Sequence, residues 1–103
     1  MTTDTRIRRT EIIIEAPLLE KVISEVTNCG AKGYTVVRGH SGRGERGAWQ
    51  EGQISPAQHM MILIVIADST VTDAILEGLA SNLELYSGIV TVSDVDVLRP
   101  HRF

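Results

Sequence analysis

Residues 38–51 contain the side chains best suited to binding an anion. The segment reads R-G-H-S-G-R-G-E-R-G-A-W-Q-E, in which four glycines alternate with three arginines. Glycine lets the backbone approach a ligand closely, and a guanidinium donates paired hydrogen bonds to phosphate or carboxylate. A long loop of this composition in a small domain is expected to bind an anionic ligand. The candidate contacts are Gly42, Arg43, Gly44 and Arg46.

Two other interpretations of this segment remain open. It is either a ligand-binding loop or simply a solvated surface loop, and Trp49 either contacts a ligand or partner or packs the loop down. The run from Gly42 to Gly47 also matches the dinucleotide fingerprint G-x-G-x-x-G. That fingerprint needs a helix directly after it, whereas residues 48–57 contain Gly52 and Pro56 and no helical period. We interpret the match as accidental.

Composition limits the class of protein. A chain of 103 residues fits one domain, and 43% hydrophobic with 22% charged residues is typical of a folded globular protein. The net charge of −3 argues against a nucleic-acid binder. Cys29 is the only cysteine, which excludes an intramolecular disulfide and a cysteine-cluster zinc site. The histidines are not spaced as a ligand set, so no metal is expected. The sequence contains no nucleophile motif and no paired catalytic carboxylates, so no catalytic residues are expected.

The N-terminal residues and the longest apolar run indicate the cellular compartment of the protein. Residues 1–10 are polar and charged, unlike a signal peptide. The longest apolar run, at 60–67, is too short to span a bilayer. A cytoplasmic protein is therefore expected.

Hydrophobic periodicity predicts two β-α-β halves joined by a long loop at about 40–57. Pro17 suits a first helical turn, Gly30 a helix stop and Asp68 a helix N-cap. The last strand alternates out of phase after residues 93–94, which suggests a bulge there. The expected strands cover 6–15, 33–38, 58–67 and 89–98, and the expected helices follow Pro17 and Asp68.

This order predicts an α+β, ferredoxin-like fold: a four-stranded antiparallel sheet with both helices on one face. The other face should then be polar, yet residues 12–14 and 60–67 are apolar without alternation. Strands that are apolar on both faces need both faces covered. Self-association through the open face, most simply as a closed trimer, provides that cover.

The final residues, 98–103, read L-R-P-H-R-F. They are either a frayed terminus or a basic arm. As an arm, Arg99 and Arg102 would donate charge-assisted bonds to the phosphate of the same ligand.

Three features together resemble the PII signalling superfamily. They are G-A-K-G-Y-T-V at 30–36, the paired β-α-β halves, and the ending V-L-R-P-H-R-F. The likeness covers nearly the whole chain, and it is greater to the PII-like proteins associated with bicarbonate transporters and carboxysomes.

The resemblance implies a homotrimer that binds adenine nucleotides in the clefts between subunits. It also implies that the long segment is the T-loop, which changes conformation with the ligand and touches a partner, and that the turn before the last strand is the B-loop. The resemblance, together with the composition of the long loop and the basic tail, gives the candidate nucleotide-binding residues. They are Thr35, Gly42, Arg43, Gly44, Arg46, Leu63, Ile64, Val65, Ser87, Gly88, Ile89, Arg99 and Arg102.

One departure concerns the B-loop. Standard PII proteins have a glycine- and lysine-containing B-loop, whereas residues 85–89 here read L-Y-S-G-I without lysine. ADP, AMP or cyclic AMP is therefore expected in preference to ATP with magnesium. The long loop also contains no tyrosine, so uridylylation is not expected. The resemblance implies a non-enzymatic sensor of an adenine nucleotide, with bicarbonate as a second ligand and a bicarbonate transporter as partner.

Two alternatives come from other classes. A small ferredoxin-like enzyme or binding domain acting on an anionic metabolite would place a histidine or carboxylate on its sheet face, and that face is expected to be aliphatic here. A shell component would need flat lateral contacts, which an arginine-rich loop serves poorly.

Overall fold

The computed structural model describes residues 6–44, 47–54, 58–82 and 88–99. The elements follow one another as β1 (Ile7–Glu15), η1 (Ala16–Leu18), α1 (Leu19–Asn28), β2 (Thr35–Arg38), β3 (Ser41–Gly44), β4 (Gly47–Gln50), η2 (Glu51–Gln53), β5 (Met60–Asp68), α2 (Ser69–Ala80) and β6 (Ile89–Asp94). Within the described ranges, no helix combines the length and the apolar character that crossing a membrane requires.

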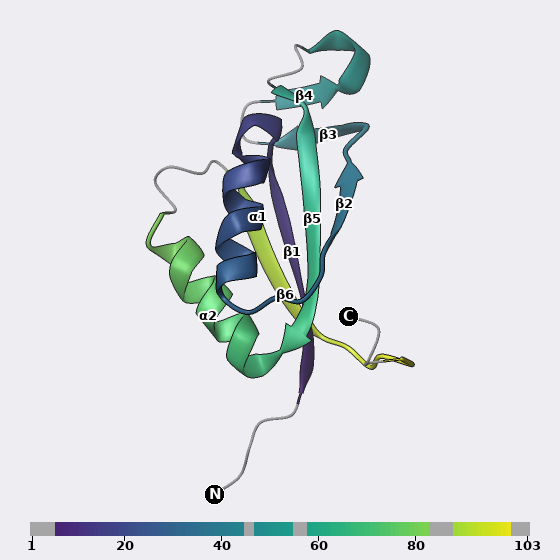
Figure 1. Ribbon diagram of the computed structural model, residues 1–103. Coiled ribbons are helices and arrows are strands. Elements are labelled where there is room, and N and C mark those ends of the chain that lie inside the picture. Colours follow the sequence, from purple (N-terminus) through teal and green to yellow (C-terminus); the bar gives the residue numbers. More distant parts are fainter. Residues whose placement is uncertain (1–5, 45–46, 55–57, 83–87, 100–103) are drawn as a thin grey trace, which may run out of the picture.

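The main sheet has the strand order β2-β5-β1-β6, and every neighbouring pair is antiparallel. Both helices lie on one face of this sheet (Figure 1). The first strand of each β-α-β half therefore occupies the centre, and the second strand of each half forms an edge. This arrangement confirms the predicted ferredoxin-like fold.

The core lies between the sheet and the helices. Alternate residues of β1 and β5 are buried, because successive side chains of a strand point to opposite faces. They pack against the apolar stripes of α1 and α2. The buried hydrophobic residues are Ile12, Ile14, Val22, Val26, Leu63, Val65, Ala67, Ile75 and Leu79.

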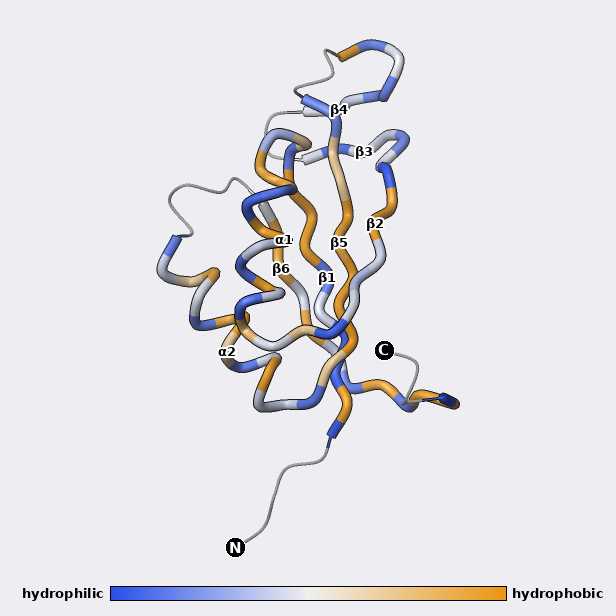
Figure 2. Tube along the Cα trace, viewed as in Figure 1, coloured by the Kyte–Doolittle hydropathy of each residue, from blue (hydrophilic) through white to orange (hydrophobic). Residues whose placement is uncertain are grey.

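The opposite face of the sheet also carries apolar residues of β1 and β5, as predicted. Ile13 lies across from Ile62 on one side and from Ile89 on the other, and Ile62 lies across from Val37. Directly opposed residues share a face, so these four side chains form a row across the sheet. Ile89 is 60% exposed and Val37 is 43% exposed. Figure 2 shows the hydrophobic character of the central strands.

That face is not wholly aliphatic, however, which corrects one expectation. Arg9 and Glu11 alternate with the buried residues of β1 and therefore lie on the open face. Their side chains form an ion pair, Nη1 to Oε2, at 3.4 Å. This ion pair was not predicted from the sequence, because the run of isoleucines at residues 12–14 makes the strand look apolar on both faces. Which residues of β1 face away from the helices becomes clear only from the register.

Local sequence features explain where α1 begins and ends and where α2 begins. Pro17 lies in the short 3₁₀ turn that precedes α1. Gly30, with a φ of +109°, ends the helix as predicted, and the Ala31 amide returns to the Val26 carbonyl at 3.1 Å. At the start of α2, the carboxylate of Asp68 accepts the Val71 N–H at 2.9 Å.

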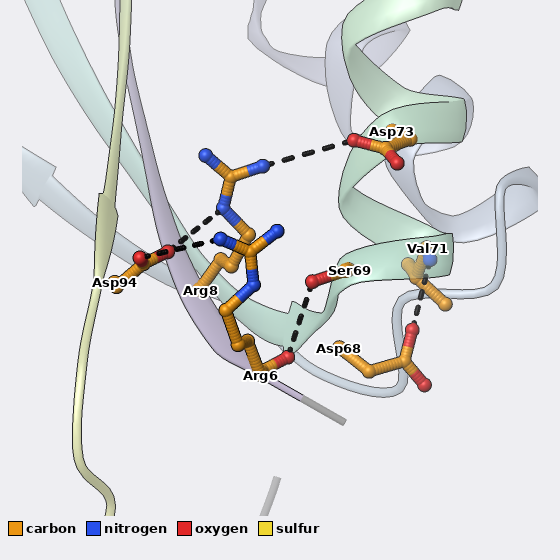
Figure 3. Close-up of polar contacts among 7 residues, drawn as sticks. All are labelled: Arg6, Arg8, Asp68, Ser69, Val71, Asp73 and Asp94. Carbon is orange, nitrogen blue, oxygen red and sulfur yellow. Dashed lines mark hydrogen bonds and ion pairs between the residues drawn. The ribbon is translucent and has the colours of Figure 1, made fainter. Parts of the chain in front are cut away.

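Ion pairs connect β1, β6 and α2 at the end of the sheet near the start of α2 (Figure 3). Arg8 on β1 contacts Asp94 on β6, Nε to Oδ1, at 3.2 Å and Asp73 on α2, Nη1 to Oδ1, at 3.7 Å. Arg6 adds a second ion pair to Asp94, at 3.7 Å. Arg8 thereby connects an edge strand, a central strand and a helix.

The last strand is shorter than predicted. The one-to-one pairing of β6 with β1 continues to Asp94 without a bulge. The strand then ends, apart from one bond from the Val95 N–H to the Ile7 carbonyl at 3.0 Å. The change of phase in the sequence marks the end of the strand, because Ile7 is the first residue of β1 and no ladder continues beyond it.

Candidate functional site

The segment expected to be an irregular loop contains a β-hairpin beyond one end of the main sheet (Figure 1). β3 pairs with β4, with Gly42 opposite Trp49 and Gly44 opposite Gly47. Gly47 has a φ of +100°, a conformation that glycine adopts without strain. The sequence S-G-R-G of β3 carries no apolar alternation, which is why the residue pattern predicted a loop.

Trp49 packs against the glycines of this hairpin. A Cβ atom added to Gly42 would lie 2.8 Å from Trp49 Cζ2, and one added to Gly39 would lie 3.0 Å from Trp49 Cη2. Glycine is needed at both positions for this close approach. Trp49 therefore has the packing role that was considered from the sequence.

The base of the hairpin is held by a set of polar contacts that the sequence did not reveal. The Arg38 Nη1 donates to Glu51 Oε1 at 3.2 Å. The Glu51 N–H donates to the His40 carbonyl at 2.8 Å, and His59 Nε2 lies 3.2 Å from the Glu51 carbonyl oxygen. The Gly39 N–H donates to the Met60 carbonyl at 2.8 Å. Opposite charges at the two ends of a long loop were the available signal for Arg38 and Glu51.

The predicted contacts on the hairpin itself are accessible. Gly42, Arg43 and Gly44 are all exposed in β3. Arg46 lies outside the described residues. The described part of the hairpin therefore presents backbone and one guanidinium to solvent, close to the point where β2 ends.

The predicted contacts on β2 and β5 are only partly brought together. Thr35 lies directly opposite Ile64, so both are on the open face beside the edge of the sheet. Leu63 and Val65 alternate with Ile64 and are buried in the core, with exposures of 0% and 1%. Their side chains pack under the helices, and only Ile64 of the three presents its side chain to the open face.

The remaining predicted contacts lie on the other edge of the sheet. Gly88 immediately precedes β6, and a Cβ atom there would collide with the Ile13 carbonyl and lie 2.7 Å from Ile14 Cγ2. Ile89 begins β6, and Arg99 is exposed after this strand. Ser87 and Arg102 lie outside the described residues.

These positions divide the candidate site into two clusters. One comprises Thr35, Ile64 and the hairpin, beside β2, and the other comprises Gly88 and Ile89, beside β6. The two edge strands are three strand spacings apart in the sheet order, about 14 Å at the usual strand spacing. The two clusters therefore do not form a single contact surface within one subunit.

The comparisons with known proteins agree on a family. The family model described as "Nitrogen regulatory protein P-II" matches residues 7–102. A search among curated proteins found no significant sequence match.

Solved structures give the same result. CPII from Thiomonas intermedia K12, a nitrogen regulatory PII-like protein bound to ADP, AMP and bicarbonate, is 30% identical, with a TM-score of 0.83 over 94% of this chain and 92% of that one. A putative PII-like signalling protein from Thermus thermophilus is 27% identical, with a TM-score of 0.80 over 96% of both chains. GlnK of B. subtilis in complex with ATP, at 15% identity and a TM-score of 0.62 over 88% of this chain and 84% of that one, shares the fold.

Proposed function

Because the chain belongs to the nitrogen regulatory protein P-II family, we propose that it is a non-enzymatic cytoplasmic signalling protein that binds an adenine nucleotide. ADP or AMP is the proposed effector, with cyclic AMP as the other candidate and bicarbonate as a second ligand. The support is the similarity to CPII, which was solved with ADP, AMP and bicarbonate, together with the absence of lysine from residues 85–89.

The proposed binding site is a cleft between subunits of a homotrimer. The observation that carries this proposal is the division of the candidate residues between the two edges of one sheet, β2 and β6. Two subunits placed edge to edge would join the β2 cluster of one to the β6 cluster of the next. Burial of the apolar row through Ile13 and Ile62 would stabilise this assembly by removing it from water.

In this proposal the strand residues and the hairpin residues of the β2 cluster have distinct roles. Thr35 and Ile64 border the adenine, with Leu63 and Val65 supporting that strand from the core. The glycine backbone of β3 and the guanidinium of Arg43 receive the phosphate. The full set of proposed nucleotide contacts is Thr35, Gly42, Arg43, Gly44, Arg46, Ile64, Ser87, Gly88, Ile89, Arg99 and Arg102.

The hairpin segment, residues 40–57, is the proposed partner-binding T-loop. Ligand binding would shift its population between conformations, and one of these would bind or release a partner. A membrane transporter of bicarbonate is the proposed partner, in a carbon-concentrating context with carboxysomes. Glu11 on the open face gives the enzyme alternative no support, because its carboxylate is paired with Arg9.

Isothermal titration with AMP, ADP, ATP and cyclic AMP, each with and without sodium bicarbonate, tests this function. We expect micromolar binding of a mono- or diphosphate, weakened by Arg43→Ala because a charge-assisted bond is lost. Sedimentation analysis should give a trimer. A monomeric protein that binds none of the four nucleotides would refute the proposal.

A further inference from the structure

We propose that Arg38 binds an oxyanion, and that this ligand competes with the Glu51 carboxylate, which contacts Arg38 in the structure. Ligand and Glu51 would then compete for one guanidinium at the base of the hairpin. This inference rests on the proposed function for its ligand, and it adds two residues that neither the sequence patterns nor the family resemblance identified.

The geometry makes Arg38 an accessible binding residue. It is the last residue of β2 and lies opposite Met61 on β5, so its backbone is fixed by the ladder. Its side chain is 60% exposed, although it already contacts Glu51 Oε1 at 3.2 Å. A guanidinium on a fixed strand with an open approach can accept a second anion or exchange its first one.

Glu51 is held in place independently of its carboxylate. Its N–H donates to the His40 carbonyl at 2.8 Å, and its carbonyl oxygen lies 3.2 Å from His59 Nε2. Both backbone groups are therefore fixed, so only the side-chain torsions of Glu51 remain to be ordered when its carboxylate contacts Arg38. The Glu51 carboxylate therefore acts as an intramolecular ligand of the Arg38 guanidinium.

The chemistry of the two anions is closely matched. A carboxylate and a bicarbonate ion both present a planar pair of oxygens with one negative charge, and a phosphate oxygen pair also fits the guanidinium fork. An ion pair exposed to this degree is weak, and it changes an equilibrium constant by at most about five-fold. An arriving oxyanion can therefore displace Glu51 without breaking the fold.

Displacement has a structural consequence for the hairpin. Glu51 directly follows β4, the strand that contains Trp49. Loss of the Arg38 contact removes the one side-chain ion pair between β2 and the residue that ends the hairpin, among the contacts of the described residues. Occupancy of Arg38 would thus loosen the hairpin base, and Trp49, the only tryptophan in the chain, would report it by its fluorescence.

The test is a double-mutant cycle on the full chain with wild type, Glu51→Gln, Arg38→Met and the double variant. Each protein is titrated with ADP, with sodium bicarbonate, and with ADP in the presence of bicarbonate. We expect Glu51→Gln to bind about two- to five-fold more tightly, because the competing charge is gone. Arg38→Met should bind more weakly, and Glu51→Gln should add nothing in the Arg38→Met background. Asp73→Asn, which breaks an exposed ion pair near the start of α2, is the matched control and should bind like wild type.

The separate arms identify the anion. A gain with ADP alone assigns Arg38 to the phosphate, and a gain only when bicarbonate is present assigns it to bicarbonate; both support the proposal. Trp49 emission of ligand-free Glu51→Gln should lie closer to that of ligand-bound wild type. Circular dichroism verifies that each variant is folded.

Several results would overturn the proposal. An unchanged affinity in Glu51→Gln removes the competition. A gain that persists in the Arg38→Met background means that Glu51 acts through its general charge and not through Arg38. If wild type binds ADP while all variants bind like wild type both with and without bicarbonate, this inference fails and the proposed function stands. If wild type binds neither ADP nor bicarbonate, both fail.

Discussion

Replacement of Gly88 by alanine should destabilise the protein, because the position has no room for a Cβ atom. The added carbon would collide with the Ile13 carbonyl and approach Ile14 Cγ2 to 2.7 Å. A backbone carbonyl in a central strand cannot turn aside as a flexible side chain can. The start of β6 would have to move away from β1, at the typical cost of overpacking, about 1–3 kcal/mol.

Thermal denaturation followed by circular dichroism measures this effect. For a domain of this size, each kcal/mol lowers Tm by about 4–8 °C, so the Gly88→Ala variant should melt at least about 4 °C below wild type. Protein concentration must be equal across samples, since the Tm of an oligomer depends on it.

Gly33→Ala provides the matched control. Nothing lies within 4 Å of a Cβ atom at Gly33, and its φ is not positive. The same chemical change there should leave Tm unchanged or raise it slightly, because alanine has fewer unfolded conformations. Equal melting temperatures for the two variants would refute the steric account of Gly88.

Three further predictions test other parts of the molecule. Ile13→Asp places a charge in the apolar row of the open face and should convert a trimer to smaller species in sedimentation, because an unpaired charge is costly to bury; a trimer that persists would place the interface elsewhere. Asp68→Ala should lower stability by about 1 kcal/mol in urea denaturation through loss of the α2 N-cap, whereas Asp68→Asn, which keeps a capping oxygen, should be nearly neutral. Leu63→Ala should cost about 2–5 kcal/mol, as expected for a buried leucine, whereas Ile64→Ala should chiefly weaken ADP binding; the reverse pattern would contradict the assignment of faces on β5.

The sequence predicted the sheet and the helices because their residues repeat with the periods of strands and helices. Gly30 and Asp68 could be assigned to helix ends because each has one local role. The hairpin within the long loop was not predicted, because β3 is built from glycine, serine and arginine and has no face to bury. The end of β6 was also misplaced, since Asp94 is the last residue with a partner on β1, and the length of the partner strand does not appear in the pattern of β6 itself.

The site was harder to predict than the fold, because its residues are related only by tertiary structure. Arg38 and Glu51 are thirteen positions apart. They are in contact because the β3–β4 hairpin between them brings the chain back to the end of β2. Leu63, Ile64 and Val65 are adjacent in sequence, yet two of them are buried in the core. Strand periodicity predicts this alternation, but it does not say which of the two sets faces the helices until the register is known.

The two edges of the sheet carry different chemistry, and this difference has a consequence for assembly. The β2 edge leads into the hairpin with its arginines, whereas the β6 edge begins at Gly88, where the chain passes close to the Ile13 carbonyl. In the proposed trimer, a ligand that contacts the β2 edge of one subunit and the β6 edge of the next would also stabilise the assembly through its binding free energy. In that assembly the apolar row through Ile13 and Ile62 would affect ligand affinity without contacting the ligand, because it would set the distance between the two clusters. The hairpin, anchored at Arg38 on the β2 edge, is the part of the subunit in which ligand binding at the seam would be converted into a change of surface.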